Sequence, residues 1–237
     1  MLLVHAWLLA AAVVWTFVHL GVSGTRLRTF IVRAIGEAAF RGVFSLASVT
    51  ILVWLVWSYR IAGPVQVLWV TPHWLIVLSM LLMLPALVLF VGSVTVPNPT
   101  MVQSRRALAT EIPARGVLRV TRHPMLWSFA IWAFVHLIMV GTLGATIFFG
   151  AFLTVALAGM PSLDAKISGR GLEGWPAFMQ ATSIVPFIAI AQGRNRLDIA
   201  EIGFWRIAAA LAAWFVLIAL HPVLFHVAAW SYLQIGQ

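Results

Sequence analysis

The chain contains no cysteine among its 237 residues. This absence excludes disulfide bonds, thiolate metal ligands, iron–sulfur clusters and cysteine nucleophiles. A metal ion or a metal-containing cofactor would therefore need histidine, methionine or carboxylate ligands. The seven histidines of the chain are the first candidates for such a role.

Charged residues are also scarce. Only 9% of the residues are charged, whereas 62% are hydrophobic, and the mean hydropathy is +1.02. Water-soluble domains have about 45–50% apolar and about 25% charged residues. The composition therefore excludes a soluble globule and predicts a protein of the lipid bilayer.

Acidic residues are the rarest charged type, with six acids against fifteen bases and a formal charge of +9. A basic excess also occurs in nucleic-acid-binding proteins, which spread it over solvated surface. Here the bases lie between long apolar stretches instead. We therefore expect the bilayer as the partner and no nucleic acid.

Six apolar stretches are long enough to cross a bilayer, which requires roughly 20 helical residues. They cover residues 2–22, 43–59, 75–94, 125–140, 143–160 and 204–227. The sequence predicts an all-α fold, a polytopic membrane bundle of about six transmembrane helices. No repeat or low-complexity tract divides the chain, so residues 1–237 are expected to form a single domain.

The basic residues predict how this bundle is oriented, because Lys and Arg in short loops stay on the cytoplasmic side. Fourteen of the fifteen fall in alternate loops, and only Arg60 falls on the other side. Both termini are therefore expected on the non-cytoplasmic side. The fourteen are Arg26, Arg28, Arg33, Arg41, Arg105, Arg106, Arg115, Arg119, Arg122, Lys166, Arg170, Arg194, Arg196 and Arg206.

Two cytoplasmic loops are long enough to carry structure. Residues 24–42 alternate bases with apolar side chains, which fits either an interfacial helix or a basic connector. Residues 161–202 hold four of the six acids and are expected to be the most solvated segment, a cap over the helix ends. Glu37 is expected to be structural, paired with Arg33 or Arg41 four residues away.

Common catalytic motifs are absent. The sequence has no HExxH, paired-carboxylate or Ser-His-Asp pattern, and no GxGxxG or Walker sequence. Hydrolase, metalloprotease and nucleotide-binding functions are therefore unsupported. A transporter is disfavoured because no buried acid pairs or interrupted helices occur in matching halves.

The histidines remain the candidate functional residues. Placing an ionisable side chain within the membrane costs free energy, and residues kept there are often functional. His19 and His123 fall in one cytoplasmic layer, and His136 follows His123 by thirteen residues, about 20 Å of helix. Two helix-borne imidazoles facing one cavity can hold a haem. The alternative for each is a structural histidine bonded to a backbone carbonyl. His5, His73, His221 and His226 fall in or near the outer layer.

His123 lies between Arg122 and Pro124, and the proline suits the first turn of a helix. An arginine and a histidine at a helix N-terminus form a site for an anion, such as a haem propionate or a phosphate. The alternative is that these residues are only a basic segment at the membrane surface that contains a proline. The residues alone leave both interpretations open.

Several segments resemble the NnrU family, which includes bacterial NnrU and the 15-cis-zeta-carotene isomerases of plants and cyanobacteria. The strongest is GVLRVTRHPMLWSFAIWAFVHLIMVGTL at residues 116–143. Residues 15–28, 36–49 and 182–197 are similar to other segments of the family, so the resemblance runs through most of the chain. It implies a bacterial inner-membrane protein.

The resemblance implies haem b as cofactor, with His19 and His136 as the iron ligands. The isomerases have a cysteine three residues before the second ligand, and Ala133 stands there in this chain. A redox-linked change to a thiolate ligand is therefore impossible here.

Straight helices place His19 and His136 on levels about 10–15 Å apart, which a bis-histidine iron does not tolerate. Deeper insertion of the first span, helix tilt, or His123 as the partner of His19 would resolve the conflict. Arg122 with His123 is the second choice, as alternative ligand or propionate clamp. Phe129 and Trp132, near His136, are the candidate substrate pocket, and ordinary helix packing is the alternative.

Two functions follow from the resemblance. The first is an accessory haem protein of nitric oxide and nitrite (denitrification) metabolism, with a redox partner or a membrane complex. The second is an enzyme, a haem-dependent carotenoid cis–trans isomerase.

Overall fold

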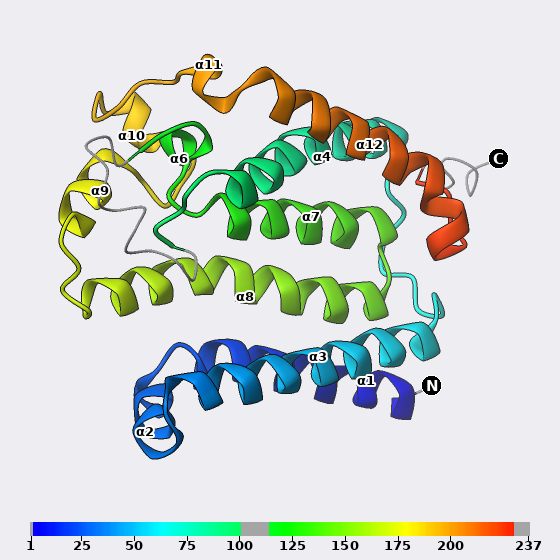
Figure 1. Ribbon diagram of the computed structural model, residues 1–237. Coiled ribbons are helices and arrows are strands. Elements are labelled where there is room, and N and C mark those ends of the chain that lie inside the picture. Colours follow the sequence, from blue (N-terminus) through cyan, green and yellow to red (C-terminus); the bar gives the residue numbers. More distant parts are fainter. Residues whose placement is uncertain (1, 101–113, 230–237) are drawn as a thin grey trace.

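The computed structural model describes residues 2–100 and 114–229, and within these ranges the fold is helical with a single isolated β-bridge between Val67 and Thr142. Six long elements run side by side (Figure 1). They are α1 (Leu2–Thr16), continued by the π-helical turn η1 (Phe17–Val22), α3 (Glu37–Ala62), α4 (His73–Thr95), α7 (Pro124–Val140), α8 (Leu143–Ser168) and α12 (Phe204–Phe225).

Helix α8 lies in the middle of the bundle (Figure 1). It packs against α7 on one side and against α1 and α3 on the other, while α4 lies between α7 and α12. The largest buried apolar cluster joins α1, α3, α7 and α8 and includes Leu8, Leu55, Ala133 and Phe148. The outermost helices expose apolar side chains, as expected where lipid replaces water.

The prediction of a polytopic helical membrane fold is confirmed. Within residues 2–100 and 114–229, five helices are long and apolar enough to span a membrane, and α7 is a shorter apolar helix of 17 residues. Most boundaries lie within three residues of the prediction, and two differ by more. Helix α3 begins at Glu37, and α8 continues through Pro161 to Ser168. Hydropathy misses such extensions because the added turns carry polar residues at the end of the bundle.

The short elements gather at one end of the bundle (Figure 1). They are α2 (Arg26–Ile35), α6 (Val117–Val120), α9 (Trp175–Ala181), α10 (Ile188–Ala191) and α11 (Ile199–Ile202). The described members of the predicted cytoplasmic set of bases lie at this end, and α1 begins and α12 ends at the other. Arg60, in the last turn of α3, lies at that other end. Arg105 and Arg106 fall outside the described residues.

Within the segment 24–42, residues Arg26–Ile35 form the separate helix α2, which fits the interfacial interpretation, and residues 37–42 belong to α3. Thr25 caps α2 by accepting a hydrogen bond from the Leu27 amide, and Gly36 ends it at a φ of 84°. Phe30 is 72% exposed on a helix that also carries Arg26 and Arg33. Such a helix is suited to lie on a lipid surface.

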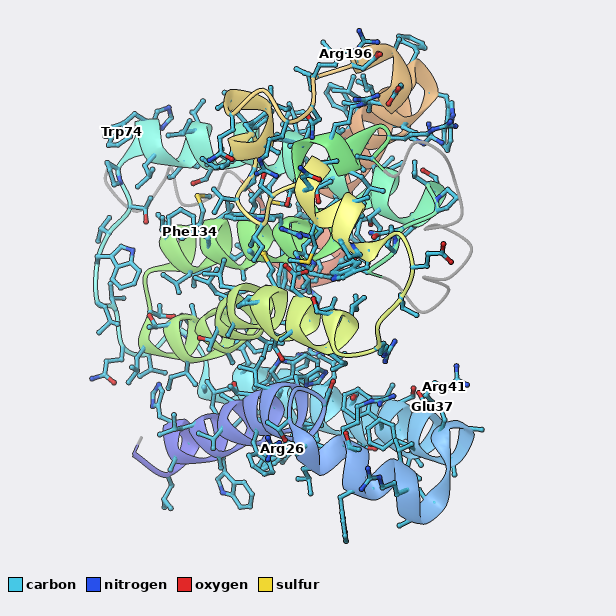
Figure 2. All side chains as sticks on the ribbon, turned by 90° about the vertical axis from the view of Figure 1, so that its left-hand side faces the viewer. Arg26, Glu37, Arg41, Trp74, Phe134 and Arg196 are labelled. Carbon is cyan, nitrogen blue, oxygen red and sulfur yellow. The ribbon has the colours of Figure 1, made fainter. Side chains whose placement is uncertain are left out.

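Glu37 begins α3 and forms ion pairs with Arg28 and Arg41. It accepts two hydrogen bonds from Arg28 Nη2, at 2.6 and 2.8 Å, and lies 3.9 Å from Arg41. Figure 2 looks onto this end and shows Glu37 beside Arg41. Of the two predicted alternatives, Arg33 or Arg41, the pairing with Arg41 is the one that occurs, and the turn at Gly36 folds α2 back and brings Arg28 to the carboxylate as a further partner.

At the opposite end, a tight turn joins α7 to α8. Gly141 ends α7 at a φ of 62°, and its carbonyl accepts hydrogen bonds from the Leu68 and Trp69 amides. A Cβ at this position would lie 2.2 Å from the Trp69 carbonyl oxygen. Glycine is therefore required both by the left-handed backbone and by the close approach of the neighbouring segment.

We predict that Gly141→Ala lowers the free energy of unfolding by roughly 2–4 kcal/mol, from left-handed strain plus steric overlap. Gly171→Ala is the matched control, because Gly171 has a φ of 60° but nothing within 4 Å of its Cβ position. It should cost only about 1 kcal/mol. Chemical unfolding of the purified protein in detergent compares them, and equal losses would contradict the close packing at Gly141.

Candidate functional site

Hydrogen bonds to the carbonyls of residues 183 and 184 hold the start of α7 in place. The Arg122 amide donates to the Ser183 carbonyl at 2.8 Å, and Thr121 Oγ1 donates to the Ile184 carbonyl at 2.7 Å. Pro124 then begins the helix, with His123 at the N-cap position. This anchoring turns the Arg122 and His123 side chains toward α8.

A buried polar cluster forms where these two side chains meet Asp164 of α8. His123 Nε2 donates to Asp164 Oδ1 at 2.9 Å, and Arg122 Nε lies 3.4 Å from Asp164 Oδ2. The side chain of His123 is fully buried, and those of Arg122 and Asp164 are 7% and 9% exposed. We call Arg122, His123 and Asp164 the polar cluster.

Three buried nitrogen atoms of the polar cluster lack a hydrogen-bond partner in the described part of the chain. They are Arg122 Nε, Arg122 Nη1 and His123 Nδ1. Burial lowers the pKa of Arg122, and the nearby Arg194 charge acts in the same direction, while Asp164 opposes them. A buried guanidinium with unpaired nitrogens is costly, so the site is suited to an additional acceptor.

His19, the first predicted ligand, lies in the π-helical turn η1. Its Nδ1 donates to the Trp15 carbonyl at 2.9 Å, and its ring stacks 3.9 Å from the Trp15 ring. The hydrogen bond fixes the tautomer and leaves Nε2 with a free lone pair, the arrangement common in metal-binding histidines. π-Helical turns are themselves frequent at functional sites.

His136, the second predicted ligand, lies in the outer half of α7 and repeats this arrangement. Its Nδ1 donates to the Trp132 carbonyl at 2.8 Å. The ring lies between Trp132, with centroids 5.2 Å apart, and Phe149 of α8, with centroids 5.1 Å apart. Taken singly, each of the two imidazoles fits the requirements of an iron ligand.

The two histidines do not converge on one point. Trp15 contacts Phe152 of α8, Phe152 contacts Trp132, and Trp132 contacts His136. His19 lies one turn from Trp15 toward the end of the bundle that carries the polar cluster, and Phe149 lies three residues from Phe152 toward the opposite end. The offset along the bundle axis is therefore about 10 Å. A haem ligated by both would require these rings to move.

An indole nitrogen near His19 gives a second indication of a ligand. Trp15 Nε1 is buried and has no hydrogen-bond partner among the described residues. An acceptor beside His19 would satisfy this group. No cluster of three histidine, aspartate or glutamate side chains suited to a metal ion occurs in ranges 2–100 and 114–229.

The two predicted pocket residues face different neighbours. Trp132 packs on Phe149 and Phe152 of α8, with centroids 5.3 and 5.4 Å away. Phe129 is 42% exposed and contacts Phe90 of α4, with centroids 6.2 Å apart. Of the two predicted pocket residues, only Trp132 packs in the same aromatic cluster as His136. Ala133 is fully buried in the same apolar cluster.

Asp164 was missing from the residues predicted for the site. The segment 161–202 was expected to be solvated, and this is wrong for Asp164, which continues the buried face of α8 beyond Pro161. A signal was present in the sequence. Leu163 and Ile167 continue a helical apolar spacing on either side of Asp164.

A second ion pair joins α6 to α11. Arg119 Nε and Nη2 donate to the two oxygens of Glu201 at 2.7 and 2.8 Å, and the Gly116 amide donates to the same carboxylate at 3.1 Å. The hydrogen bonds from Arg119, the largest cause, and from Gly116 lower the pKa of Glu201 to about 2.

The NnrU protein family provides the decisive comparison, because its sequence model matches residues 7–229. The chain belongs to the NnrU family. The match includes both histidine segments, the polar cluster and the cap, so the family resemblance predicted from the sequence is confirmed. No solved structure gives a significant match.

Two curated relatives are named 15-cis-zeta-carotene isomerase, chloroplastic. The protein of Arabidopsis thaliana is 25% identical over 205 residues, and that of Zea mays is 25% identical over 206. Each match covers 80% of this chain and 52% of the relative. The chain thus spans about half the length of the curated relatives it matches.

We predict that Asp164→Ala lowers the free energy of unfolding by about 3–5 kcal/mol, because it leaves buried Arg122 and His123 without their acceptor. Glu37→Ala is the control. Its ion pairs are partly exposed, with a 46% exposed carboxylate, so the loss should stay below about 1 kcal/mol. Unfolding in detergent measures both, and a small loss for Asp164→Ala would contradict the buried interaction.

The Arg119–Glu201 pair predicts a loss of stability in acid. The pKa of Glu201 is about 2 in the folded chain and ordinarily 4.5. The pair therefore stabilises the fold fully above about pH 4.5 and progressively less as the pH falls toward 2. Glu201→Gln should reduce this part of the acid dependence of thermal unfolding. An unchanged profile between pH 4.5 and 2 would contradict the assignment.

Proposed function

We propose that the chain is an integral membrane enzyme that binds haem b and isomerises a cis double bond of a long apolar polyene. The observation that carries the proposal is the enclosure of His136 by Trp132 and Phe149 within the apolar core. The similarity to proteins named zeta-carotene isomerases supports the substrate class. A carotenoid-type hydrocarbon would reach such a site from the lipid.

His19 and His136 are the proposed iron ligands, because each has an Nδ1 fixed on a carbonyl and an Nε2 lone pair free. Haem would supply a redox-active iron when bound. Since the two imidazoles lie on different levels, the proposal requires Trp15, Phe152 and Trp132 to repack when haem binds. Arg122 and His123 remain the second choice, as a propionate clamp or alternative ligand.

The chain's own contribution is to provide an apolar, aromatic enclosure. Trp132 and Phe149 pack on the His136 ring, and Phe152 packs on Trp132, so the surroundings of His136 are aromatic and apolar. Flat aromatic faces suit contact with the extended π-system of a polyene. Phe129, exposed on α7, is a proposed contact on the lipid side.

A second candidate function is favoured by Ala133. The residue is fully buried three positions before His136 and has no side chain that binds iron. A protein without a ligand change suits an accessory role in nitric oxide and nitrite metabolism, in which haem handles a gas or an electron for a redox partner. The location proposed for either function is the bacterial inner membrane.

We predict that the purified protein has a haem b spectrum, and that His19→Ala and His136→Ala each lose most of it. His73→Ala is the control, because His73 is an exposed histidine at the start of α4. Oxidised and reduced visible spectra of equal protein amounts measure this. A wild-type protein without haem absorption, after growth with ample haem, would contradict the cofactor.

Membranes containing the wild-type protein should convert a cis-zeta-carotene to its trans product, and His136→Ala should slow the conversion at least tenfold. Chromatography of the extracted carotenes measures it, and His73→Ala serves again as the control. A haem-loaded protein that converts none of the carotene would overturn the isomerase proposal and leave the accessory function.

A further inference from the structure

Helix α2 connects two membrane-spanning helices, and its position follows from theirs. The first candidate span ends at Val22, and the second begins at Glu37. Figure 1 shows α2 among the short elements at one end of the bundle. Because both neighbouring spans reach the edge of the lipid at this point, α2 lies at the boundary between lipid and water.

Both ends of α2 are held by its neighbours, so the faces that it exposes are defined. Thr25 Oγ1 donates to the Gly21 carbonyl, which joins the start of the helix to η1. Arg28 donates to Glu37 of α3, and its guanidinium lies 5.2 Å from the centre of the Phe40 ring. The face that carries Arg28 therefore packs on α3, and the opposite faces point away from the protein.

One of these outer faces is apolar. Leu27, Phe30 and Ala34 follow each other at helical spacing on one side of α2, and all three are exposed. Exposed apolar side chains gathered on one face of a helix are unfavourable in water, and burial among acyl chains removes them from it. The face is therefore suited to contact with lipid.

A basic strip borders the apolar face. Arg26 and Arg33 are seven residues apart on the same side of α2, and both are exposed. In ranges 2–100 and 114–229 neither pairs with an acid, and the Glu37 carboxylate is occupied by Arg28 and Arg41. Figure 2 shows Arg26 away from Glu37. Since α2 has no acidic residue, its exposed charge is positive and complements negatively charged headgroups.

The start of α12 supports the position of the membrane boundary. Phe204 is 86% exposed, and the Arg206 guanidinium lies 4.6 Å from the centre of the exposed Trp205 ring. Aromatic side chains are enriched at the lipid–water interface, and arginine side chains extend from there to the headgroups. Figure 1 places this helix start at the same end of the bundle as α2. Two separate elements thus indicate that this end meets the headgroup region.

We propose that α2 binds anionic phospholipids of the membrane surface, with Arg26 and Arg33 on the headgroup phosphates and Leu27, Phe30 and Ala34 among the acyl chains. A membrane fits this helix better than a second copy of the chain does, because two α2 helices in contact would bring their arginines together. The proposal is independent of the isomerase function, because it requires neither haem nor polyene.

The absence of cysteine allows a single fluorescent label to be attached to α2. Ala34→Cys places the label on the apolar face, and Thr29→Cys places it on the polar side of the same helix. The purified full chain is placed in nanodiscs of phosphatidylcholine, with or without phosphatidylglycerol, and a water-soluble quencher is added. With phosphatidylglycerol, the label at residue 34 should be quenched roughly threefold less than the label at residue 29. In phosphatidylcholine alone this protection should be largely lost.

Substitution of the two arginines tests the recognition of charge. In the labelled Ala34→Cys chain, Arg26→Gln combined with Arg33→Gln should abolish the effect of phosphatidylglycerol. Lysine at both positions should retain most of it, because attraction to an anionic surface depends on charge. Arg115→Gln combined with Arg196→Gln is the matched control. It removes two exposed arginines outside α2 and should leave the protection unchanged.

Raised salt concentration tests the same attraction without any substitution of an arginine. Salt screens exposed charges, so the effect of phosphatidylglycerol on the label at residue 34 should weaken. Protection that requires phosphatidylglycerol and falls both with salt and with the glutamine substitutions supports the proposal.

Three results would overturn the proposal. A label at residue 34 that stays accessible to the quencher in both kinds of disc would show that α2 does not enter the lipid. Protection that is equally strong in phosphatidylcholine alone, or in the glutamine variant, would show insertion without recognition of charge. Protection that appears only in discs with two copies of the chain would assign the apolar face to a contact between copies.

Discussion

The contact between Asp164 and the Arg122–His123 pair joins the two helices on which the other candidate residues depend. Among the described residues Asp164 is the only buried carboxylate, and it sets the position of α7 against α8 at the end of the bundle where the short helices lie. Because α7 is a stiff helix, this position also decides which α8 residues face its outer half. The placement of His136 against Phe149 follows from it.

Helix α8 lies between the two halves of the bundle, so its two ends must meet different packing requirements. Its outer half must be apolar to pack against Trp132 and Trp15, and its inner half must hold a carboxylate and pass through Pro161. Polar groups within a membrane protein are tolerated when they pair with one another. The polar cluster meets this requirement in part, because Arg122 and His123 both pair with Asp164 but retain nitrogens without a hydrogen-bond partner among the described residues.

Hydropathy and charge were sufficient to predict the helices, because lipid forces backbone groups into long apolar helices and bases mark the loops. The level offset between His19 and His136 also follows from counting residues, and the structure retains it at about 10 Å. The pairing of Glu37 with Arg28 could not be predicted in the same way, because it depends on how the turn at Gly36 folds α2 back, which helical periodicity does not encode. The burial of Asp164 was signalled only by the apolar spacing of Leu163 and Ile167, because the polar residues around it lower the hydropathy of this end of α8.

A double-mutant cycle between His123 and Asp164 tests the central interaction most directly. His123→Ala, Asp164→Ala and the double variant would be unfolded under identical conditions in detergent. The account predicts a coupling free energy of about 1.5–3 kcal/mol, because each substitution removes the partner of a buried group. Additivity within about 0.3 kcal/mol would show that the two side chains act independently and would contradict the account.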